Sequence, residues 1–198
     1  MKSEKSKILF VIIILLALTF GIVAIRKNSK PVITDLIIEE PKQEDNIDNQ
    51  IPASENNIIF LKTDRPNIKV GDNFDVTVSF SAPGKRIFGS DVVLLYDPEI
   101  LSTNQENIVN GSFFESVPKK SVDPKNGIIK ISAYGGADKS GVDSSDIISI
   151  KFIANSAGTS KIDVAFEKGT TNTTTLVEDK TSKNILEKTN GLTVKIEN

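Results

Sequence analysis

The sequence predicts an all-β domain that lies behind an N-terminal transmembrane helix and a disordered linker. Residues 8–25 form an uncharged apolar run, and residues 26–56 are rich in proline and acidic side chains. Residues 57–198 hold short apolar segments bounded by turn residues. Many short strands at such a spacing are typical of β-sandwiches and barrels. About 140 residues follow the two N-terminal segments, which is a usual size for one domain.

Residues 8–25 are dominated by Ile, Leu, Val and Phe. As a helix they would span roughly 27 Å, close to the roughly 30 Å of a hydrocarbon core. We expect an uncleaved signal anchor rather than a cleaved signal peptide, because the run is long and the nearest small-x-small exit, Ile22-Val23-Ala24, is poor. The two flanks of this run carry nearly equal positive charge, so the positive-inside rule does not by itself set the orientation. A β-domain behind the anchor favours cytoplasmic residues 1–7 and an extracytoplasmic C-terminal part, in a single-pass protein of the cell membrane.

Residues 26–56 read as a flexible tether. They contain Pro31, Pro41 and Pro52, with acidic pairs and repeated Asn and Gln between them. Such a composition cannot bury enough apolar surface to offset the entropy of ordering, so the segment is expected to stay extended and solvated.

The composition excludes several function classes. The 198 residues include no Cys and no His, which excludes disulfides, cysteine-rich zinc sites, and Ser-His-Asp or Cys-His catalysis. A net charge of −2 with interspersed signs argues against nucleic-acid binding. Two-carboxylate glycosidase chemistry survives composition alone, but no acidic pair is singled out and solvated surface charge explains the acids. We therefore expect no enzyme and no cofactor.

Metal binding is also weakly supported. The segments Asp123-Pro124-Lys125-Asn126 and Asp143-Ser144-Ser145-Asp146 could offer oxygen ligands to calcium. Neither has acids at every second position before a glycine, as a calcium loop requires. Asx side chains favour turns, which explains both segments more simply. We predict no metal site.

The strand segments are short, and Gly, Pro, Asn, Asp or Ser bound most of them. The best are Ile58–Lys62, Phe74–Ser81, Ile87–Tyr96, Ile128–Tyr134, Ile147–Ala154, Lys161–Phe166 and Leu192–Ile196. Within residues 74–81 every second residue is apolar, so Phe74, Val76, Val78 and Phe80 are predicted to face the core. Residues 169–183, rich in threonine, are predicted to form a long loop or an edge hairpin.

The segment from residue 91 to residue 101 is the most informative. Residues 92–96 are apolar without a break, so both faces of this strand are apolar. We expect Val92, Leu94 and Tyr96 to point inward, and Asp91, Val93 and Leu95 to point outward. The outward residues are then covered either by a partner or by a neighbouring loop.

A single helical turn is expected to close this strand. Asp97 is a good N-cap and Pro98 a good first helical residue, so residues 97–101 are predicted to form that turn.

An ordered set of motifs resembles the cohesin family over roughly residues 58–196. The set comprises Gly71-Asp72-Asn73-Phe74, the Val76/Val78/Phe80 alternation, Asp91 to Leu101, Gly111-Ser112-Phe113-Phe114, Gly127 to Tyr134, Ile147 to Ala154, Ala157-Gly158-Thr159 and Leu192 to Ile196. The resemblance implies a jelly-roll β-sandwich that binds dockerin modules, within a wider group that includes carbohydrate-binding modules. This chain has no calcium loop of the kind a dockerin carries.

The resemblance also implies a partner-binding face. Cohesins carry an Asn-x-Asp pair on the central strand, and the matching residues here are Gly89 and Asp91, so the acid is kept and the amide is lost. Val93 and Leu95 share the parity of Asp91 and would form an apolar strip with one hydrogen-bonding acid at its end. The family often has an acidic residue near the position of Tyr134, which is a second departure. The partner-binding residues implied are Gly89, Asp91, Val93, Leu95 and Tyr134.

Three functions therefore stay open, all non-catalytic. The first is docking of a dockerin-like module or other surface protein at the cell envelope. The second is carbohydrate binding linked to polysaccharide degradation, which usually needs aromatic platforms. Trp is absent, Tyr96 is assigned to the core, and Tyr134 is either structural or a contact residue. The third is a structural envelope or adhesion domain. Exposed Val93 and Leu95 would favour docking, an exposed Tyr134 lining a polar groove would favour sugar, and a fully polar face would favour the structural role.

Overall fold

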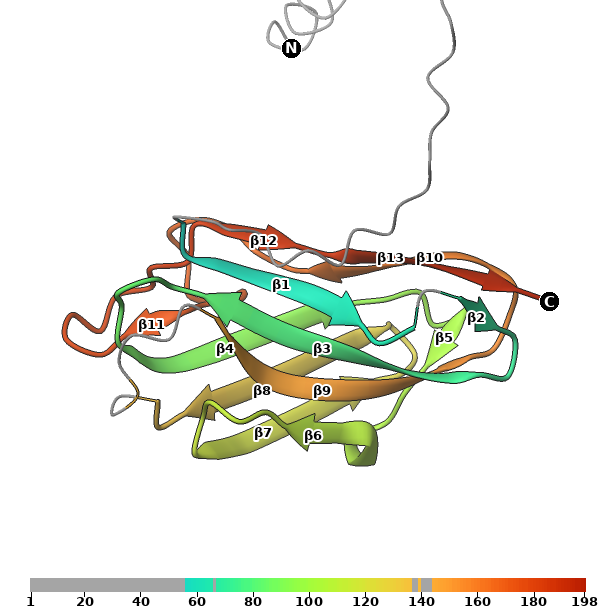
Figure 1. Ribbon diagram of the computed structural model, residues 1–198, viewed down its shortest axis with the longest axis horizontal. Coiled ribbons are helices and arrows are strands. Elements are labelled where there is room, and N and C mark those ends of the chain that lie inside the picture. Colours follow the sequence, from blue (N-terminus) through green and yellow to red (C-terminus); the bar gives the residue numbers. More distant parts are fainter. Residues whose placement is uncertain (1–55, 66, 137–138, 140–143) are drawn as a thin grey trace, which may run out of the picture. The chain divides into compact units, whose positions relative to one another are not determined.

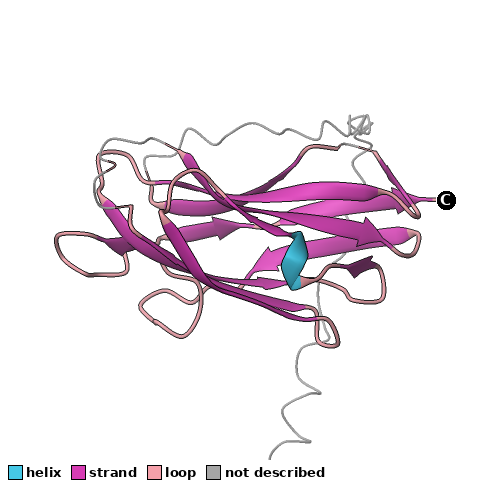
Figure 2. Cartoon of the chain, turned by 90° about the horizontal axis from the view of Figure 1, so that it is seen from below, coloured by secondary structure: helices cyan, strands magenta, loops and turns pink. Residues whose placement is uncertain are grey.

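The computed structural model describes residues 56–65, 67–136, 139 and 144–198 (Figure 1). The predicted transmembrane helix at 8–25 and all but the last residue of the predicted linker lie outside these ranges. No helix within them is long and apolar enough to cross a membrane. Their one helical element is a 3-10 turn, η1 (Gln105–Asn107), drawn in cyan in Figure 2. The rest is built of strands and loops.

The described residues form two sheets, and Figure 1 shows β3 and β9 in front of β4 and β8. The first sheet has the order β12-β1-β3-β9-β5, with β6 paired to β9. Its strands are β1 (Ile58–Thr63), β3 (Asn73–Ser81), β5 (Leu101–Ser102), β6 (Ile108–Asn110), β9 (Ser145–Ala154) and β12 (Lys188–Asn190). Pairing is antiparallel except for the parallel pair β1 and β12.

The second sheet has the order β2-β13-β10-β4-β8-β7, with β11 paired to β4. Its strands are β2 (Ile68–Lys69), β4 (Ile87–Leu95), β7 (Ser116–Asp123), β8 (Ile128–Tyr134), β10 (Gly158–Val164), β11 (Val177–Glu178) and β13 (Leu192–Glu197). The chain passes repeatedly from one sheet to the other, as in a jelly roll. The predicted all-β sandwich is therefore confirmed.

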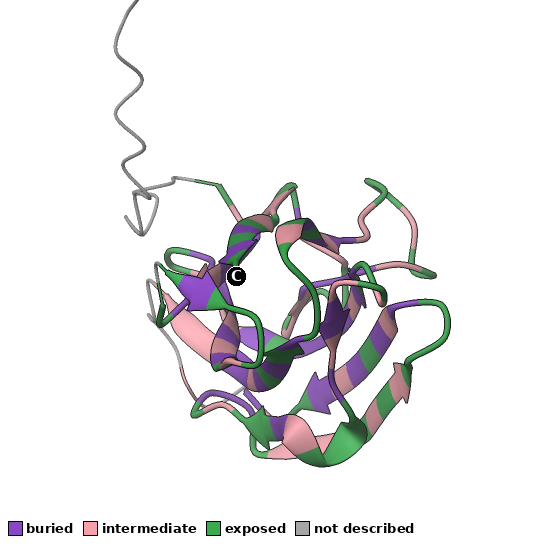
Figure 3. Cartoon of the chain, turned by 90° about the vertical axis from the view of Figure 1, so that its right-hand side faces the viewer, coloured by how far each residue is buried: buried purple, intermediate pink, exposed green. Residues whose placement is uncertain are grey.

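The core lies between the sheets, and buried and outward residues alternate along the strands (Figure 3). The predicted inward residues of β3, from Phe74 to Phe80, are all at most 1% exposed, which confirms that alternation. Phe152 of β9 stacks on Phe74 at 5.9 Å between ring centroids and meets Tyr96 edge-on at 5.4 Å. Phe80 makes a second edge-on contact with Phe113 at 4.7 Å. Aromatic pairs with these geometries add to the free energy gained by burial alone.

The prediction for residues 91–101 holds for the inward residues and for the capped turn. Val92 and Leu94 are fully buried and Tyr96 is 6% exposed, so the inward parity is confirmed. Burial raises the pKa of the Tyr96 hydroxyl, and the nearby Asp123 adds to that rise. The Asp97 carbonyl accepts the Leu101 amide at 2.9 Å, and its side chain accepts the Glu99 amide at 2.9 Å. One capped turn therefore follows β4 as expected, but residues 98–100 form a hydrogen-bonded turn rather than a helical one, and Leu101 already belongs to β5.

Three parts of the second sheet differ from the prediction, the first being the short strand β2, which was not predicted. Strand β7 was not predicted, because it is a terminal strand whose polar residues do not alternate, and Pro118 lies in a register shift between Ser116 and Lys119. Strand β10 ends at Val164 rather than at Phe166, because the chain leaves the sheet there. Residues 165–176 then return to β4, and β11 continues the pairing. Residues 165–176, called the strap below, include the first part of the threonine-rich segment. The strap runs beside β4 and is partly buried, with Thr174, Thr175 and Leu176 at most 3% exposed.

One polar cluster links β9 to β1 and β3 within the first sheet. The Asp146 carboxylate accepts hydrogen bonds from Lys62 Nζ at 2.8 Å and from the buried Ser79 hydroxyl at 2.7 Å. Burial raises the pKa of Asp146, but the hydrogen bonds from Lys62 and Ser79 and the charge of Lys62 outweigh it and hold the pKa below its usual value. The folded state therefore favours the charged carboxylate.

Asp146→Asn is expected to lower the free energy of unfolding at neutral pH by less than about 1 kcal/mol, because this ion pair is well exposed and screened. A lowered folded pKa gives stabilisation that is present above the ordinary aspartate pKa of about 3.9 and is lost as the pH falls through the folded pKa. Urea unfolding of both proteins at neutral and at strongly acidic pH tests this. The difference between them should vanish in acid, and a difference that stays constant with pH would contradict it.

Candidate functional site

The five residues proposed for partner binding lie on one face of the second sheet. Strands β4 and β8 are antiparallel neighbours without a register shift, so directly opposed residues share a face. The opposed outward pairs are Gly89 with Tyr134, Asp91 with Ser132, Val93 with Lys130, and Leu95 with Ile128. These eight residues are called the β4–β8 face below. From Ser90 to Leu94 the residues of the other parity are buried, but at the start of β4 the pattern reverses, with Ile87 buried and Phe88 47% exposed. Gly89, although it lies opposite Tyr134, is itself buried.

The apolar part of the β4–β8 face is only partly covered. Leu95 is 42% exposed, whereas Val93 is half-buried. The strap explains the difference, because Ala165 donates its amide to the Val93 carbonyl at 2.8 Å and the Thr174 hydroxyl accepts the Val93 amide at 3.0 Å. The sequence left open whether a partner or a neighbouring loop covers this strip. The neighbouring loop, here the strap, borders Val93 but leaves Leu95 exposed.

Asp91 is held by its backbone and leaves its carboxylate free. Its amide donates to the Thr175 hydroxyl at 3.2 Å, and its carbonyl accepts the Thr175 amide at 2.8 Å. Within the described residues, the carboxylate itself has no hydrogen bond or ion pair. An exposed acid on a fixed backbone is ready to accept hydrogen bonds from an incoming partner.

Gly89 explains one departure from the cohesin pattern. A Cβ at this position would lie 3.0 Å from the Ala133 carbonyl and 3.5 Å from the Cβ of Tyr134. The first of these contacts is tight and the second is ordinary, so the pairing with β8 leaves little room for a side chain at Gly89. Tyr134 is 48% exposed there. The strand register therefore places an aromatic side chain of β8 opposite the position where the resemblance implies an amide.

A hollow of about 340 Å³ lies beside Asp91 and Val93. Lys119, Lys130 and Ser132 line it together with residues 171–173 of the strap. Sequence reasoning missed these residues. The alternation within residues 128–134 could have placed Lys130 and Ser132 on the outer face, but Lys119 stands on the unpredicted β7. Tyr134 does not line this hollow.

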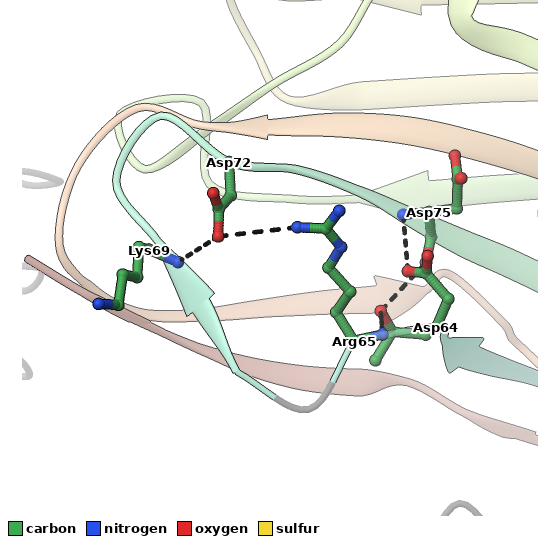
Figure 4. Close-up of polar contacts among 6 residues, drawn as sticks. Asp64, Arg65, Lys69, Asp72 and Asp75 are labelled. Atoms are coloured by element: carbon green, nitrogen blue, oxygen red, sulfur yellow. Dashed lines mark hydrogen bonds and ion pairs between the residues drawn. The ribbon is translucent and has the colours of Figure 1, made fainter.

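Several acidic groups elsewhere hold turns and loop connections. Asp72 accepts the Lys69 amide at 3.0 Å and pairs with Arg65 at 3.8 Å, while Asp64 accepts the Asp75 amide at 3.0 Å (Figure 4). These contacts tie the start of β3 to the connection before it. In the chain that the structure describes, no group of three or more acidic residues is placed to hold a metal ion.

The first calcium candidate is also a turn. The Asp123 carboxylate accepts the Asn126 side-chain amide at 2.8 Å and the Lys125 and Asn126 backbone amides at 3.2 Å. The Asn126 side-chain hydrogen bond is the largest cause that lowers the pKa of Asp123, followed by the Asn126 backbone amide. In the second candidate, Asp143 lies outside the described residues and Asp146 binds Lys62 and Ser79.

Comparisons with known proteins give one family and one fold. A non-cellulosomal cohesin from the hyperthermophilic archaeon Archaeoglobus fulgidus is 13% identical, with a TM-score of 0.55 over 72% of this chain and 92% of that chain. A type II cohesin domain from the cellulosome of Acetivibrio cellulolyticus is 16% identical, with a TM-score of 0.56 over 70% and 95% of the two chains. The third cohesin ScaC of the same organism, solved in complex with the ScaB dockerin, is 15% identical, with a TM-score of 0.55 over 71% and 99%.

At these identities the solved structures show a shared fold. No curated protein matches the chain. The family model described as the cohesin domain matches residues 59–196, which is most of the chain and nearly all of the two sheets. The resemblance found in the sequence is thereby confirmed, and the chain belongs to the cohesin domain family.

Proposed function

We propose that this protein is a membrane-anchored, extracytoplasmic cohesin module that docks a dockerin-like partner on its β4–β8 face. The observation that carries the proposal is that the exposed apolar side chain of Leu95 and the free carboxylate of Asp91 lie on the same face of one central strand. Membership of the cohesin family supports a non-catalytic binding role. A solved cohesin of similar fold is in complex with a dockerin.

The β4–β8 face has the chemistry that a protein interface needs. Leu95 and Val93 supply apolar area that a partner can desolvate, and Asp91 supplies one hydrogen-bonding anchor beside it. Lys130 and Ser132 give a polar margin. An apolar centre with a polar rim is the usual anatomy of such surfaces. Both flanks of β4 are hydrogen-bonded, so the face is rigid before a partner arrives.

The two alternatives are less well supported by this geometry. Sugar binding would be favoured by an exposed tyrosine in a polar groove, but Tyr134 stands opposite Gly89 and outside the hollow. A purely structural domain would be favoured by a fully polar face, but Leu95 is well exposed. Docking accounts for both residues without a further assumption.

The anchor is part of the proposal. Residues 8–25 would hold the module at the cell membrane, and residues 26–56 would tether it. A flexible chain of that length spans roughly 30 Å between its ends. The β4–β8 face would then search a thin layer outside the membrane for a partner borne on another protein. Protease accessibility of residues 57–198 in intact cells tests this orientation.

Asp91→Ala is expected to weaken dockerin binding by about 2 kcal/mol, or roughly thirty-fold, because it removes the polar anchor of the interface. Leu95→Ala should weaken binding through lost apolar contact. The measurement is isothermal titration calorimetry of the full chain in detergent against a panel of dockerin modules that includes the ScaB dockerin of Acetivibrio cellulolyticus.

Matched controls lie on the first sheet. Asp75 also stands on a central strand with no partner for its carboxylate among the described residues, and Val109 of β6 is 62% exposed. Asp75→Ala and Val109→Ala should leave affinity unchanged. Equal losses in all four variants, or no loss in Asp91→Ala, would overturn the assignment of the face. Retention on polysaccharide without any dockerin binding would favour the sugar-binding alternative.

A further inference from the structure

The hollow beside Asp91 has a simple structural origin. Ser132 of β8 stands directly between Asp91 of β4 and Lys119 of β7 in the cross-strand register. Neighbouring strands lie about 4.8 Å apart, so the two longer side chains stand about 10 Å apart over a small residue. Residues 171–173 of the strap close the side beyond β4. The result is a hollow of about 340 Å³ whose size suits one side chain of a partner.

The charges around the hollow favour an anion. Lys130 is diagonal to Lys119 across the β7–β8 pair, and both lysines line the hollow. Within the described residues, neither ammonium group makes a hydrogen bond or an ion pair. Asp91 is the one acid that lines the hollow, and residues 171–173 are uncharged. Asp123 also faces Lys130, but its carboxylate is engaged by its own turn.

We propose that this hollow receives the carboxylate of an aspartate or glutamate side chain presented by the docking partner. The inference rests on the proposed docking function and names the chemistry of one contact within it. Lys119 and Lys130 supply charge, and the Ser132 hydroxyl supplies a further donor to the incoming carboxylate, whereas the Thr173 hydroxyl is already engaged by Glu167 and Thr170 and only borders the hollow. Asp91, on the opposite side, is left to accept hydrogen bonds from neutral donors of the same partner. The partner surface is therefore acidic at one point and a hydrogen-bond donor about one strand spacing away.

Amide chemical shifts of the isotope-labelled full chain in detergent micelles test the hollow without the natural partner. The probes are acetyl-Gly-Glu-Gly-amide and the neutral control acetyl-Gly-Gln-Gly-amide. We expect saturable shifts at Lys119, Lys130, Ser132 and Thr173 with the glutamate peptide, and at least five-fold weaker binding of the glutamine peptide. Equal response to both peptides, or shifts spread evenly over the surface, would overturn the proposal.

A matched pair of double variants separates the hollow from general charge. Lys119→Gln with Lys130→Gln should weaken glutamate-peptide binding by roughly two- to five-fold per lysine. Lys151→Gln with Lys188→Gln changes the net charge equally, on exposed lysines of the first sheet, and should change nothing. Unchanged binding in the first pair, or the same loss in the second, contradicts a carboxylate site in the hollow.

The dockerin titration separates the two proposals. If a dockerin binds the wild type and the Lys119→Gln, Lys130→Gln variant equally, docking stands and the role of the hollow falls. If no dockerin binds while the glutamate peptide saturates the hollow, the dockerin assignment falls and the carboxylate site stands. A loss of dockerin affinity confined to the first lysine pair, and reduced by added salt, supports both.

Discussion

Replacing Phe152 by alanine is expected to lower the free energy of unfolding by about 3–5 kcal/mol, the largest effect of any substitution considered for this chain. Phe152 is fully buried near the C-terminal end of β9, and its ring contacts those of Phe74 and Tyr96. Both sheets pack around this aromatic group, so a truncated side chain leaves a cavity that neither can fill without moving. Urea unfolding of the full chain, followed by far-ultraviolet circular dichroism, measures the change.

Phe88→Ala is the matched control. Phe88 lies on β4 but is 47% exposed, so its truncation should change stability by no more than about 1 kcal/mol. The two variants delete the same atoms, and only burial differs. Similar losses in both variants would mean that the aromatic group around Phe152 is not the centre of the core.

Gly127→Ala is expected to cost about 3 kcal/mol, the second largest effect. Gly127 has φ of +63°, a conformation that costs L-residues roughly 1–2 kcal/mol. A Cβ there would also collide with the Tyr96 carbonyl and lie 3.0 Å from Pro98 Cδ. The backbone cannot move away freely, because the Gly127 carbonyl accepts the Tyr96 amide at 2.9 Å. The collision therefore adds to the conformational cost, and the same urea titration detects the sum.

Gly84→Ala separates the two costs. Gly84 has a similar φ of +69°, but a Cβ there meets nothing within 4 Å. It should lose only the conformational part, about 1 kcal/mol. If Gly127→Ala loses no more than Gly84→Ala, the contact between the β7–β8 turn and the end of β4 contributes nothing to stability.

The strands that could be predicted are those whose own sequence pattern shows which residues face the core. The alternation from Phe74 to Phe80 and the unbroken apolar run at 92–96 each assign inward residues without reference to other strands. Strand β7 could not be found this way, because a terminal strand with one neighbour needs no apolar alternation. The end of β10 was predicted wrongly for a related reason. Beyond Val164, the residues that hydrogen-bond to β4 are not the direct continuation of β10 but Thr174 and Thr175, which come later in the chain.

The candidate site also has a part that one strand's pattern predicts and a part that it does not. The outward parity of Asp91, Val93 and Leu95 follows from one strand, and the structure places all three on the β4–β8 face. The hollow depends on the register of three strands and on a strap some forty residues beyond β8, so no local pattern could reveal it. The transmembrane helix at 8–25 lies outside the described residues and stays a prediction, as do the linker and the cell-surface location.

The terminal strand β7 also constrains how a partner can approach. An unpaired strand edge is a template for another chain to add itself through backbone hydrogen bonds, a mode that reads little of the partner's sequence. Here Pro118 removes one donor from that edge, the register shift at Ser116–Lys119 bends it, and Lys119 and Lys120 add charge. Strand addition at β7 is therefore disfavoured, both for a second copy of this chain and for a foreign peptide. Recognition is left to side chains on the sheet face, where a single substitution can change which partner is chosen.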